Sequence, residues 1–407
     1  MTSFAVEGGQ PLRGRIWVPG DKSISHRALI LAALAEGTSS VRGLSNGDDV
    51  RRTAAAVVQM GAEIDGHQII GGRDRLHSPG GLVDVGNSGT SMRLLSGLCA
   101  AFPWRTELRG DASVDKRPMD RVIAPLRLMG ARIDDHYPPL AIDGGGLAGI
   151  DYTVPMASSQ VKGCVLLAGV GAEGETVVRE HVATRPHTEE MLAACGADIE
   201  IDGLVIRLRP SKLEPFELDV PGDPSQAAFW VVGATITPKS NVTVEGVYLG
   251  PSRTGFLGVL QRMGAKVESE ADHIRAQYAP LHGTEVHADE IPSLDEVPIL
   301  AVAAAAAEGD TRFCDVAELR IKESNRLATI ISELRALGVE AEEDGDDLIV
   351  HGGGLRPGTA DSHGDHRIAM SMAIAGASLP GRTVIEGWDA VATSYPEFED
   401  HLAACAS

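Results

Sequence analysis

The chain has 407 residues, of which 43% are hydrophobic and 23% charged, and its formal net charge at pH 7 is −21. Since one hydrophobic core rarely serves so long a chain, two domains are expected. The negative charge argues against nucleic acid and anionic membranes as partners, because both bind basic protein faces. The N-terminus lacks a signal-peptide pattern and no apolar run reaches the roughly 20 residues that span a bilayer, so a soluble cytoplasmic protein is expected.

Cysteines and histidines show no pattern of a disulfide or metal protein. The cysteines are odd in number, widely spaced and without a CxxC pair: Cys99, Cys164, Cys195, Cys314 and Cys405. Most lie in apolar helical stretches and are expected to be buried thiols. The histidines near candidate motifs lack the HExxH-type spacing of a metal site: His26, His187, His363 and His366. No metal is therefore expected.

A short phrase recurs along the chain: Gly-Ala, then a charged residue, then Ile or Val. It is found at residues 61–64, 130–133, 196–199 and 264–267, with a degenerate copy at 338–340. An apolar helical pattern precedes each glycine and an alternating, strand-like stretch follows it. The glycines are therefore predicted to cap helices at their C-terminal ends, in a left-handed backbone conformation.

Each repeat also opens with a small polar cluster that leads into an Ala/Leu-rich helix. In chain order the clusters are residues 21–25, 87–91, 158–160, 223–226, 293–296 and 365–367. The helices that follow are apolar around much of their circumference, which places them inside a domain. The pattern predicts an α/β fold in which the unit strand, buried helix, strand, outer helix, strand occurs six times, with three units in each of two domains.

Ordinary N-capping by Ser, Asp and Asn would explain any one of these polar clusters. Several helix starts, however, also carry a cation where the helix dipole favours an anion: Lys22, Arg27, Arg93, Lys162 and Arg367. Gly89 and Gln160 can add hydrogen-bond donors at two of them. Backbone N–H groups together with Arg or Lys at a helix start bind anions. A substrate with more than one negative charge is therefore expected.

Eight motifs resemble the signatures of the EPSP synthase family of enolpyruvyl transferases, in the family's order. They are PGDKSISHR (19–27), GNSGTSMR (86–93), DKRPMDR (115–121), ASSQVKG (157–163), TRPHTEEML (184–192), the Asp-Glu pair 295–296, RIKESNRL (320–327) and GDHR (364–367). The resemblance implies two inverted α/β domains built from the six units. A discontinuous domain, 1–20 plus 223–407, would carry base and carboxylate-binding groups, and an inserted domain, 21–222, the phosphate-binding groups.

The family transfers the enolpyruvyl group of phosphoenolpyruvate to the 5-hydroxyl of shikimate 3-phosphate and releases phosphate, in the pathway to chorismate and aromatic amino acids. The resemblance implies this activity here, without a metal or organic cofactor, in a monomer that is a target of glyphosate. It also implies catalytic roles for Lys22, for Asp295 as general base and for Glu323 as proton donor.

Substrate contacts follow from the same resemblance. Those implied for shikimate 3-phosphate are Lys22, Ser23, Arg27, Ser158, Ser159, Gln160, Arg185, Asp295 and Lys322. Those implied for phosphoenolpyruvate are Lys22, Gly89, Arg117, Gln160, Arg326 and Arg367. Arginine suits the carboxylate of phosphoenolpyruvate because its planar fork pairs with both oxygens.

Simpler interpretations remain open for single residues. Glu323 and Arg326 stand at i,i+3 helical spacing and could form a surface ion pair. Asp295 could be a helix N-terminal charge, and Arg117 a solvated loop residue. Two other functions are also open. One is the sister transferase that uses UDP-N-acetylglucosamine, which carries Lys-Asn where this chain has Lys22-Ser23. The other is a two-lobed anion-binding protein without catalysis.

Overall fold

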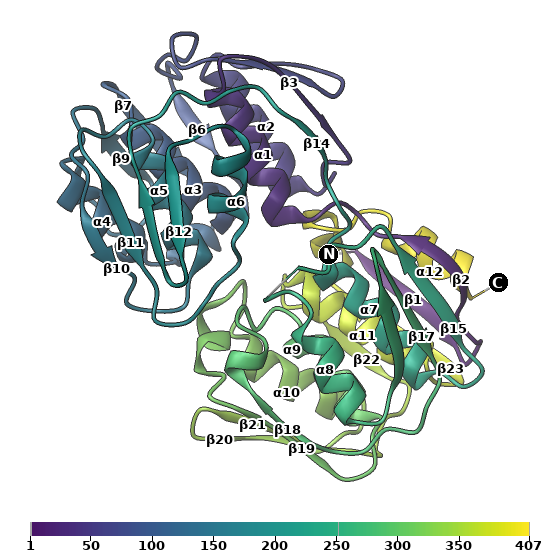
Figure 1. Cartoon of the computed structure of the whole chain (residues 1–407). Helices are drawn as coiled ribbons and strands as arrows, with labels where there is room; N and C mark the ends of the chain where they lie inside the picture. The colour runs from purple at the N-terminus through teal and green to yellow at the C-terminus, as the bar shows by residue number, and fades with distance from the viewer. Residues whose placement is uncertain (1, 251, 407) are drawn as a thin grey trace. The chain divides into compact units, whose positions relative to one another are not determined.

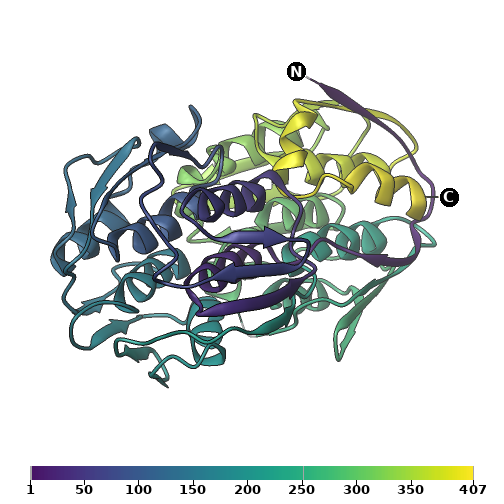
Figure 2. The same ribbon diagram turned by 90° about the horizontal axis from the view of Figure 1, so that it is seen from above.

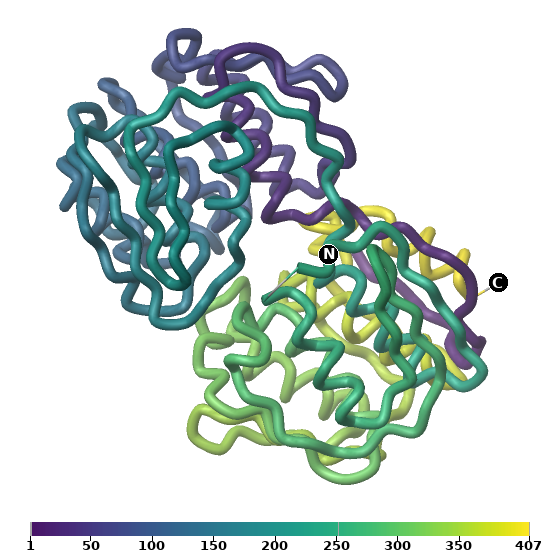
Figure 3. The backbone as a smooth tube through the Cα atoms, in the orientation of Figure 1, coloured from purple at the N-terminus to yellow at the C-terminus, as the bar shows by residue number. Residues whose placement is uncertain are grey.

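The computed structural model describes residues 2–250 and 252–406 and divides into two compact units. Unit 2 is Gly20–Val220, and it is inserted into unit 1, which holds the chain up to Pro19 and from Pro221 onward. The backbone trace in Figure 3 can be followed through both crossings. The boundaries expected from the sequence, near residues 20 and 222, lie beside these positions.

One α/β motif is repeated in both units. In its clearest copy β6 (Leu82–Asp84) and β7 (Arg105–Arg109) run parallel and are joined by helix α3 (Gly89–Ala100). The outer helix α4 (Asp120–Met129) leads into β8 (Arg132–Ile133) and β9 (Leu140–Asp143), and the strand order is β6-β7-β9-β8. The predicted α/β class is confirmed (Figure 1). The sequence predicted a single closing strand in each repeated motif. In five of the six sheets formed by the described residues, a hairpin of two strands is found there instead.

The other motifs repeat this plan. In unit 2 they comprise α1 (Lys22–Leu34), β3 (Gly37–Arg42), α2 (Asp48–Gln59), β4 (Glu63–Asp65) and β5 (Gln68–Gly71) with β14 (Glu217–Asp219), then β10 (Asp151–Thr153), α5 (Ser159–Gly169), β11 (Thr176–Arg179), α6 (His187–Ala194), β12 (Ile199–Asp202) and β13 (Val205–Leu208). A short 3-10 helix, η1 (Val114–Lys116), precedes α4.

In unit 1 the first two motifs are β2 (Arg13–Trp17), α7 (Pro224–Ile236), β15 (Asn241–Glu245), α8 (Gly255–Arg262), β16 (Lys266–Glu270) and β17 (His273–Gln277), then β18 (Glu285–His287), η2 (Ala288–Glu290), α9 (Val297–Ala305), β19 (Asp310–Cys314), η3 (Ala317–Ile321), α10 (Arg326–Ala336), β20 (Ala341–Asp344) and β21 (Asp347–His351). The third is β22 (Thr359–Asp361), α11 (His366–Ala377), β23 (Gly381–Glu386), η4 (Trp388–Thr393) and α12 (Phe398–Cys405).

Two opening strands are exchanged where the chain changes unit. β2 precedes α1 in the sequence but pairs in parallel with β15 of unit 1, while β14 precedes α7 but pairs in parallel with β3 of unit 2. The N-terminal strand β1 (Ser3–Gly8) also pairs far along the chain, antiparallel to β23. Both chain ends therefore belong to unit 1 (Figure 2).

The first helix of each motif is the buried one, as the apolar patterns predict. α1, α3 and α5 form the centre of unit 2, and α7, α9 and α11 the centre of unit 1. Every residue of α9 is buried, because its sequence VPILAVAAA has no polar face. Within residues 2–250 and 252–406, no helix has the length and apolar character needed to cross a membrane.

The predicted helix boundaries are found in the structure. Side chains accept backbone N–H bonds at five of the six buried-helix starts: Asp21, Ser88, Ser158, Asp223 and Asp365. Before α9, Glu296 instead accepts from the hydroxyl of Ser225. The recurring glycines take positive φ after the outer helices, with values of 110° at Gly61, 111° at Gly130, 75° at Gly196, 98° at Gly264 and 85° at Gly338.

Candidate active site

The start of α1 in unit 2 carries three of the predicted substrate-binding residues. The amino group of Lys22, the first residue of the helix, lies 3.0 Å from the carboxylate of Asp49. Ser23 follows it, and its hydroxyl accepts from Arg185 Nη1 at 2.9 Å. Arg185 precedes α6, so the predicted ligands Ser23 and Arg185 meet although they are far apart in the sequence.

Arg27, one turn further along α1, is buried and cross-links three helices. Its Nε donates to the Thr188 hydroxyl at 2.6 Å, Nη1 to the Ser23 carbonyl at 2.9 Å and Nη2 to the Ser159 carbonyl at 3.1 Å. Ser158, just before Ser159, caps α5 with its hydroxyl. The groups predicted to bind shikimate 3-phosphate from unit 2 therefore gather at the starts of α1, α5 and α6.

A second group surrounds the start of α3, where the sequence predicts the phosphate of phosphoenolpyruvate. A Cβ added to Gly89 would lie 3.0 Å from Arg117 Nη1 and 3.2 Å from Arg93 Nη1. Arg93 Nη1 also donates to Gln160 Oε1 at 2.6 Å, and Gln160 Nε2 donates to the Thr90 hydroxyl at 2.9 Å. Gly89, Arg117 and Gln160 are thus close together, with Arg93 as a member that the predicted ligand sets lacked.

Lys162 differs from the sequence interpretation. It was expected, like the other helix-start cations, to help bind an anion. Its amino group instead lies 2.8 Å from a carboxylate oxygen of Glu180 and 2.7 Å from one of Glu189, and all three side chains are buried. Its charge is therefore compensated inside unit 2.

A chain of short hydrogen bonds runs behind the start of α3. His26 Nδ1 lies 2.7 Å from the Thr53 hydroxyl, which lies 2.7 Å from that of Ser91, and Ser91 Oγ donates to Ser88 Oγ at 2.7 Å. Burial, with Lys22 and Arg27 nearby, holds the pKa of His26 well below its ordinary value. His26 is thus a neutral link between α1, α2 and α3.

Unit 1 holds the predicted carboxylate-binding and acid–base residues around Arg326, at the start of α10. This side chain is fully buried. Its Nε and Nη2 donate to Asp365 at 2.8 and 3.3 Å, Nη2 lies 2.6 Å from Glu323 Oε2, and Nη1 lies 3.4 Å from Asp295 Oδ1. Burial opposes the charged form, but the three carboxylates outweigh it and raise the pKa of Arg326.

Asp365 and Arg367, at the start of α11, complete this cluster. Asp365 caps the helix by accepting from the Arg367 N–H at 2.9 Å. Burial by itself would raise the pKa of Asp365, yet the Arg326 guanidinium holds that pKa below its ordinary value. Arg367 Nη1 donates to the Asp295 carbonyl at 3.2 Å, and its Nη2 lies 3.7 Å from Asp295 Oδ2. Asp295 therefore stands between two arginines.

Lys322 is nearby in the chain but makes different contacts. Its amino group donates to the Ser293 carbonyl at 3.0 Å and lies 3.5 Å from Glu318. Ser293 belongs to the same polar cluster as Asp295. The interpretation of Glu323 and Arg326 as a surface pair does not hold, since Arg326 is fully buried. The sequence signal for Asp365 was its capping position in GDHR.

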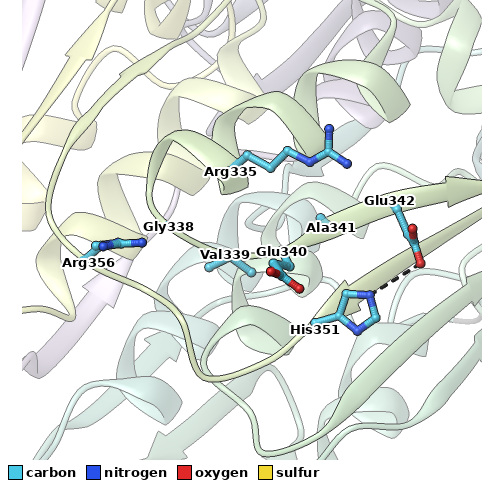
Figure 4. Close-up of a pocket in the computed structure, with 8 residues that line it drawn as sticks. All are labelled: Arg335, Gly338, Val339, Glu340, Ala341, Glu342, His351 and Arg356. Atoms are coloured by element: carbon cyan, nitrogen blue, oxygen red, sulfur yellow. Dashed lines mark ion pairs between the residues drawn. The ribbon is translucent and has the colours of Figure 1, made fainter.

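Two other features of unit 1 lie apart from these clusters. A pocket of about 440 Å³ lies at the C-terminal end of α10, where Arg335 and Arg356 accompany Glu340 and Glu342 (Figure 4). None of the predicted ligands is among the residues that line it. Elsewhere Glu285, His287 and Cys314 bring ligand atoms within 4.8 Å of one another. The His287 ring, however, already pairs with Glu285 and accepts a backbone N–H in η2, so we assign no metal there.

The repeated motif and the insertion of one unit into the other define the enolpyruvyl transferase fold. In fold the chain is similar to the enolpyruvyl transferase NikO from Streptomyces tendae, with a TM-score of 0.82 over 98% of this chain and 96% of that one, at 20% identity. It is also similar to EPSP synthase from Acinetobacter baumannii, with a TM-score of 0.87 and 41% identity over 99% and 98% of the two chains.

Sequence comparison gives the family. The sequence model of the family EPSP synthase (3-phosphoshikimate 1-carboxyvinyltransferase) matches residues 6–402 of this chain. The 3-phosphoshikimate 1-carboxyvinyltransferase of Gloeobacter violaceus is 47% identical, over 98% of each chain, and that of Xylella fastidiosa is 47% identical, over 96% of this chain and 91% of its own. The chain belongs to the EPSP synthase family and is a transferase, which confirms the resemblance seen in the motifs.

Proposed function

We propose that this chain transfers the enolpyruvyl group of phosphoenolpyruvate to the 5-hydroxyl of shikimate 3-phosphate and releases inorganic phosphate. Membership of the EPSP synthase family supports the reaction. The observation that carries it is the cluster of unit 1, where the carboxylates of Asp295 and Glu323 both contact Arg326. This cluster brings two candidate acid–base groups beside an arginine that can pair with a substrate carboxylate.

Shikimate 3-phosphate would be bound mainly by the starts of α1 and α5. Its phosphate would accept from the hydroxyls of Ser158 and Ser159 and from Arg185, with Arg27 keeping these elements in place. Lys22, Ser23, Gln160, Asp295 and Lys322 are the residues we propose for contacts with the rest of the molecule. The contacts among Arg27, Arg185 and the serine segment support this division.

Phosphoenolpyruvate carries a phosphate and a carboxylate, and we assign different residues to each. The backbone N–H at Gly89 and the guanidinium of Arg117 would take the phosphate, with Lys22 and Gln160 beside it. Arg326 and Arg367 would take the carboxylate. Because carboxylates of the protein now lie against these arginines, the substrate carboxylate would replace part of those contacts.

The proposed reaction is an addition followed by an elimination. Asp295 takes the proton of the 5-hydroxyl as its oxygen attacks C2 of phosphoenolpyruvate, and Glu323 gives a proton to C3, which becomes a methyl group. This forms a tetrahedral intermediate. Loss of inorganic phosphate by C–O cleavage, with one proton from that methyl group, restores the double bond in the product. Lys22 and the arginines stabilise the negative charge that develops.

We further propose that the enzyme needs no metal or organic cofactor, acts as a monomer in the cytoplasm and is a glyphosate target. The proposal that no metal is needed is supported by the lysine and arginine residues at the helix starts, because they can supply the positive charge that a metal would bring. The product would feed the pathway to chorismate and the aromatic amino acids.

Phosphate release tests the reaction. Mixing the chain with shikimate 3-phosphate and phosphoenolpyruvate should release inorganic phosphate, and either substrate alone should not. Treatment with a chelator should leave the rate unchanged. Release with UDP-N-acetylglucosamine in place of shikimate 3-phosphate would support the sister transferase instead. Binding of both substrates without release would support an anion-binding protein without catalysis.

A further inference from the structure

Lys162 is a buried charge that the proposed reaction does not use. It lies in the first turn of α5, two residues after Gln160, and its side chain is 1% exposed. Taking an ammonium group out of water costs several kcal/mol unless charges or hydrogen bonds compensate it. A lysine in this position therefore needs a structural or functional reason.

The partners of Lys162 lie at the two ends of one segment. Glu180 directly follows β11, and Glu189 lies in the first turn of α6. Both carboxylates are 5% exposed and lie within 2.8 Å of the Lys162 amino group. The Thr184 hydroxyl also donates to Glu180, inside the segment. One amino group thus fixes the start, and through α6 the end, of residues 180–189.

This segment carries two residues that reach α1. Arg185 donates to the Ser23 hydroxyl at 2.9 Å, and the Thr188 hydroxyl accepts from Arg27 at 2.6 Å. The segment also packs closely against α5, since a Cβ added to Gly163, the neighbour of Lys162, would lie 2.8 Å from Thr188 Oγ1. A shift of the segment by an ångström would break both bonds to α1.

We propose that Lys162 is a positioning residue for shikimate 3-phosphate, which holds residues 180–189 through Glu180 and Glu189 so that Arg185 meets the phosphate. The inference rests on the proposed function, because it takes Arg185 as a phosphate ligand. It assigns Lys162 no contact with substrate. Pairing between a planar guanidinium and a phosphate depends on orientation. Loss of the contacts of Lys162 with Glu180 and Glu189 should therefore weaken the binding of shikimate 3-phosphate.

The test must separate positioning from stability. Lys162→Met alone leaves two buried carboxylates facing each other and is expected to be poorly folded. The neutral combination Lys162→Met, Glu180→Gln, Glu189→Gln removes all three charges and keeps similar side-chain volumes, so it should fold with nearly the melting temperature of the unmodified chain. Its dissociation constant for shikimate 3-phosphate should nevertheless rise about 10-fold or more.

Two further measurements address the route through Arg185. In an Arg185→Ala background the neutral combination should weaken binding no further, because a residue that acts through Arg185 has nothing left to position. A matched control replaces the exposed pair Arg179 and Asp151 of the same sheet by Gln and Asn, and it should leave affinity unchanged. A neutral combination that folds and binds like the unmodified chain overturns the inference, and so does a full further loss in the Arg185→Ala background. If the unmodified chain itself does not bind shikimate 3-phosphate, the proposed function fails instead.

Discussion

Arg27 of unit 2 and Arg326 of unit 1 are both buried at helix starts, but their surroundings differ. The contacts of Arg27 described above are to a hydroxyl and two backbone carbonyls. Arg326 contacts the carboxylates of Asp365, Glu323 and Asp295. Hydroxyl and carbonyl oxygens orient a guanidinium without neutralising it, whereas carboxylates do both.

The difference indicates two ways to prepare a protein for an anionic substrate. In unit 2 a hydroxyl and two carbonyl oxygens orient the buried arginine. In unit 1 the acids compensate the arginine, and two of them are also the proposed acid–base groups. Because three carboxylates converge on Arg326, the stability of the unit 1 cluster should depend most on this arginine. Five experiments test whether the two units differ in this way.

The largest effect is expected on removing the compensated arginine. Arg326→Met leaves three carboxylates around an uncharged side chain, and it should lower the free energy of unfolding by about 3–5 kcal/mol. Arg27→Met leaves polar oxygens without their donor and should cost about 1–3 kcal/mol. Urea unfolding of both variants measures the difference. Equal losses would show that the carboxylates do not distinguish the two sites.

Next comes the chemical step, whose proposed acid–base groups, Asp295 and Glu323, belong to unit 1. Asp295→Asn keeps the shape of the side chain but cannot accept the hydroxyl proton as a carboxylate does, so kcat should fall about 10²-fold or more. The melting temperature should change little. The exposed Asp289→Asn serves as the control and should match the unmodified chain. An Asp295→Asn variant with normal kcat would remove this residue from the role of base.

The two units should also respond to acid at different pH values. The pKa of His26 lies well below 6.5, so just under pH 6.5 the unfolded chain binds a proton that folded unit 2 does not, and the free energy of unfolding falls as pH falls. His26→Gln should flatten this slope, and exposed His282→Gln should not. A slope unaffected by His26→Gln would refute this account.

Asp365 of unit 1 should make the free energy of unfolding depend on pH only at lower pH values. Its pKa is held below the ordinary 3.8, so the stability that its charge contributes is present above that value and is lost as pH falls through the lower, folded value. Asp365→Asn should therefore reduce the pH dependence of unfolding below about pH 4. It should leave the His26 window unchanged, because the two residues belong to different units.

The smallest expected effect is that of one methyl group at Gly89. Its backbone φ is outside the left-handed region, and the Cβ would meet the movable ends of Arg117 and Arg93, so Gly89→Ala should fold normally. Glyphosate, which is longer than phosphoenolpyruvate, should be crowded more than the substrate, by about 1–3 kcal/mol. Inhibition and Michaelis constants measure this. Equal changes in both would contradict the steric explanation.

Much of the architecture could be predicted because glycine and capping residues are local signals. The hairpins were missed although turn signals were present: Asp65-Gly66, Asp202-Gly203 and Asp344-Gly345 each divide an alternating stretch into two strands. A single long strand was the wrong interpretation of each stretch.

The sequence predicted some residues of the candidate site and missed their partners. The motif resemblance supplied Arg326 and Asp295, which the structure brings together, but the partner roles of Asp365 and Thr53 depend on tertiary packing that no spacing reveals. Lys162 was misinterpreted because its helix-start position resembles that of an anion ligand. Its place on a helix buried on all sides was the signal that it needed acidic partners.

The pairing of β1 with β23 has a consequence for synthesis on the ribosome. β1 emerges first, yet its partner is made almost last, and β2 likewise waits for β15. Unit 2, which contains all its own strands between Gly20 and Val220, can fold while translation continues. The nascent N-terminal segment meanwhile exposes the backbone of unpaired strands, which is the kind of surface that chaperones cover and that aggregates form on. Unit 1 can therefore become complete only after β23 has been made.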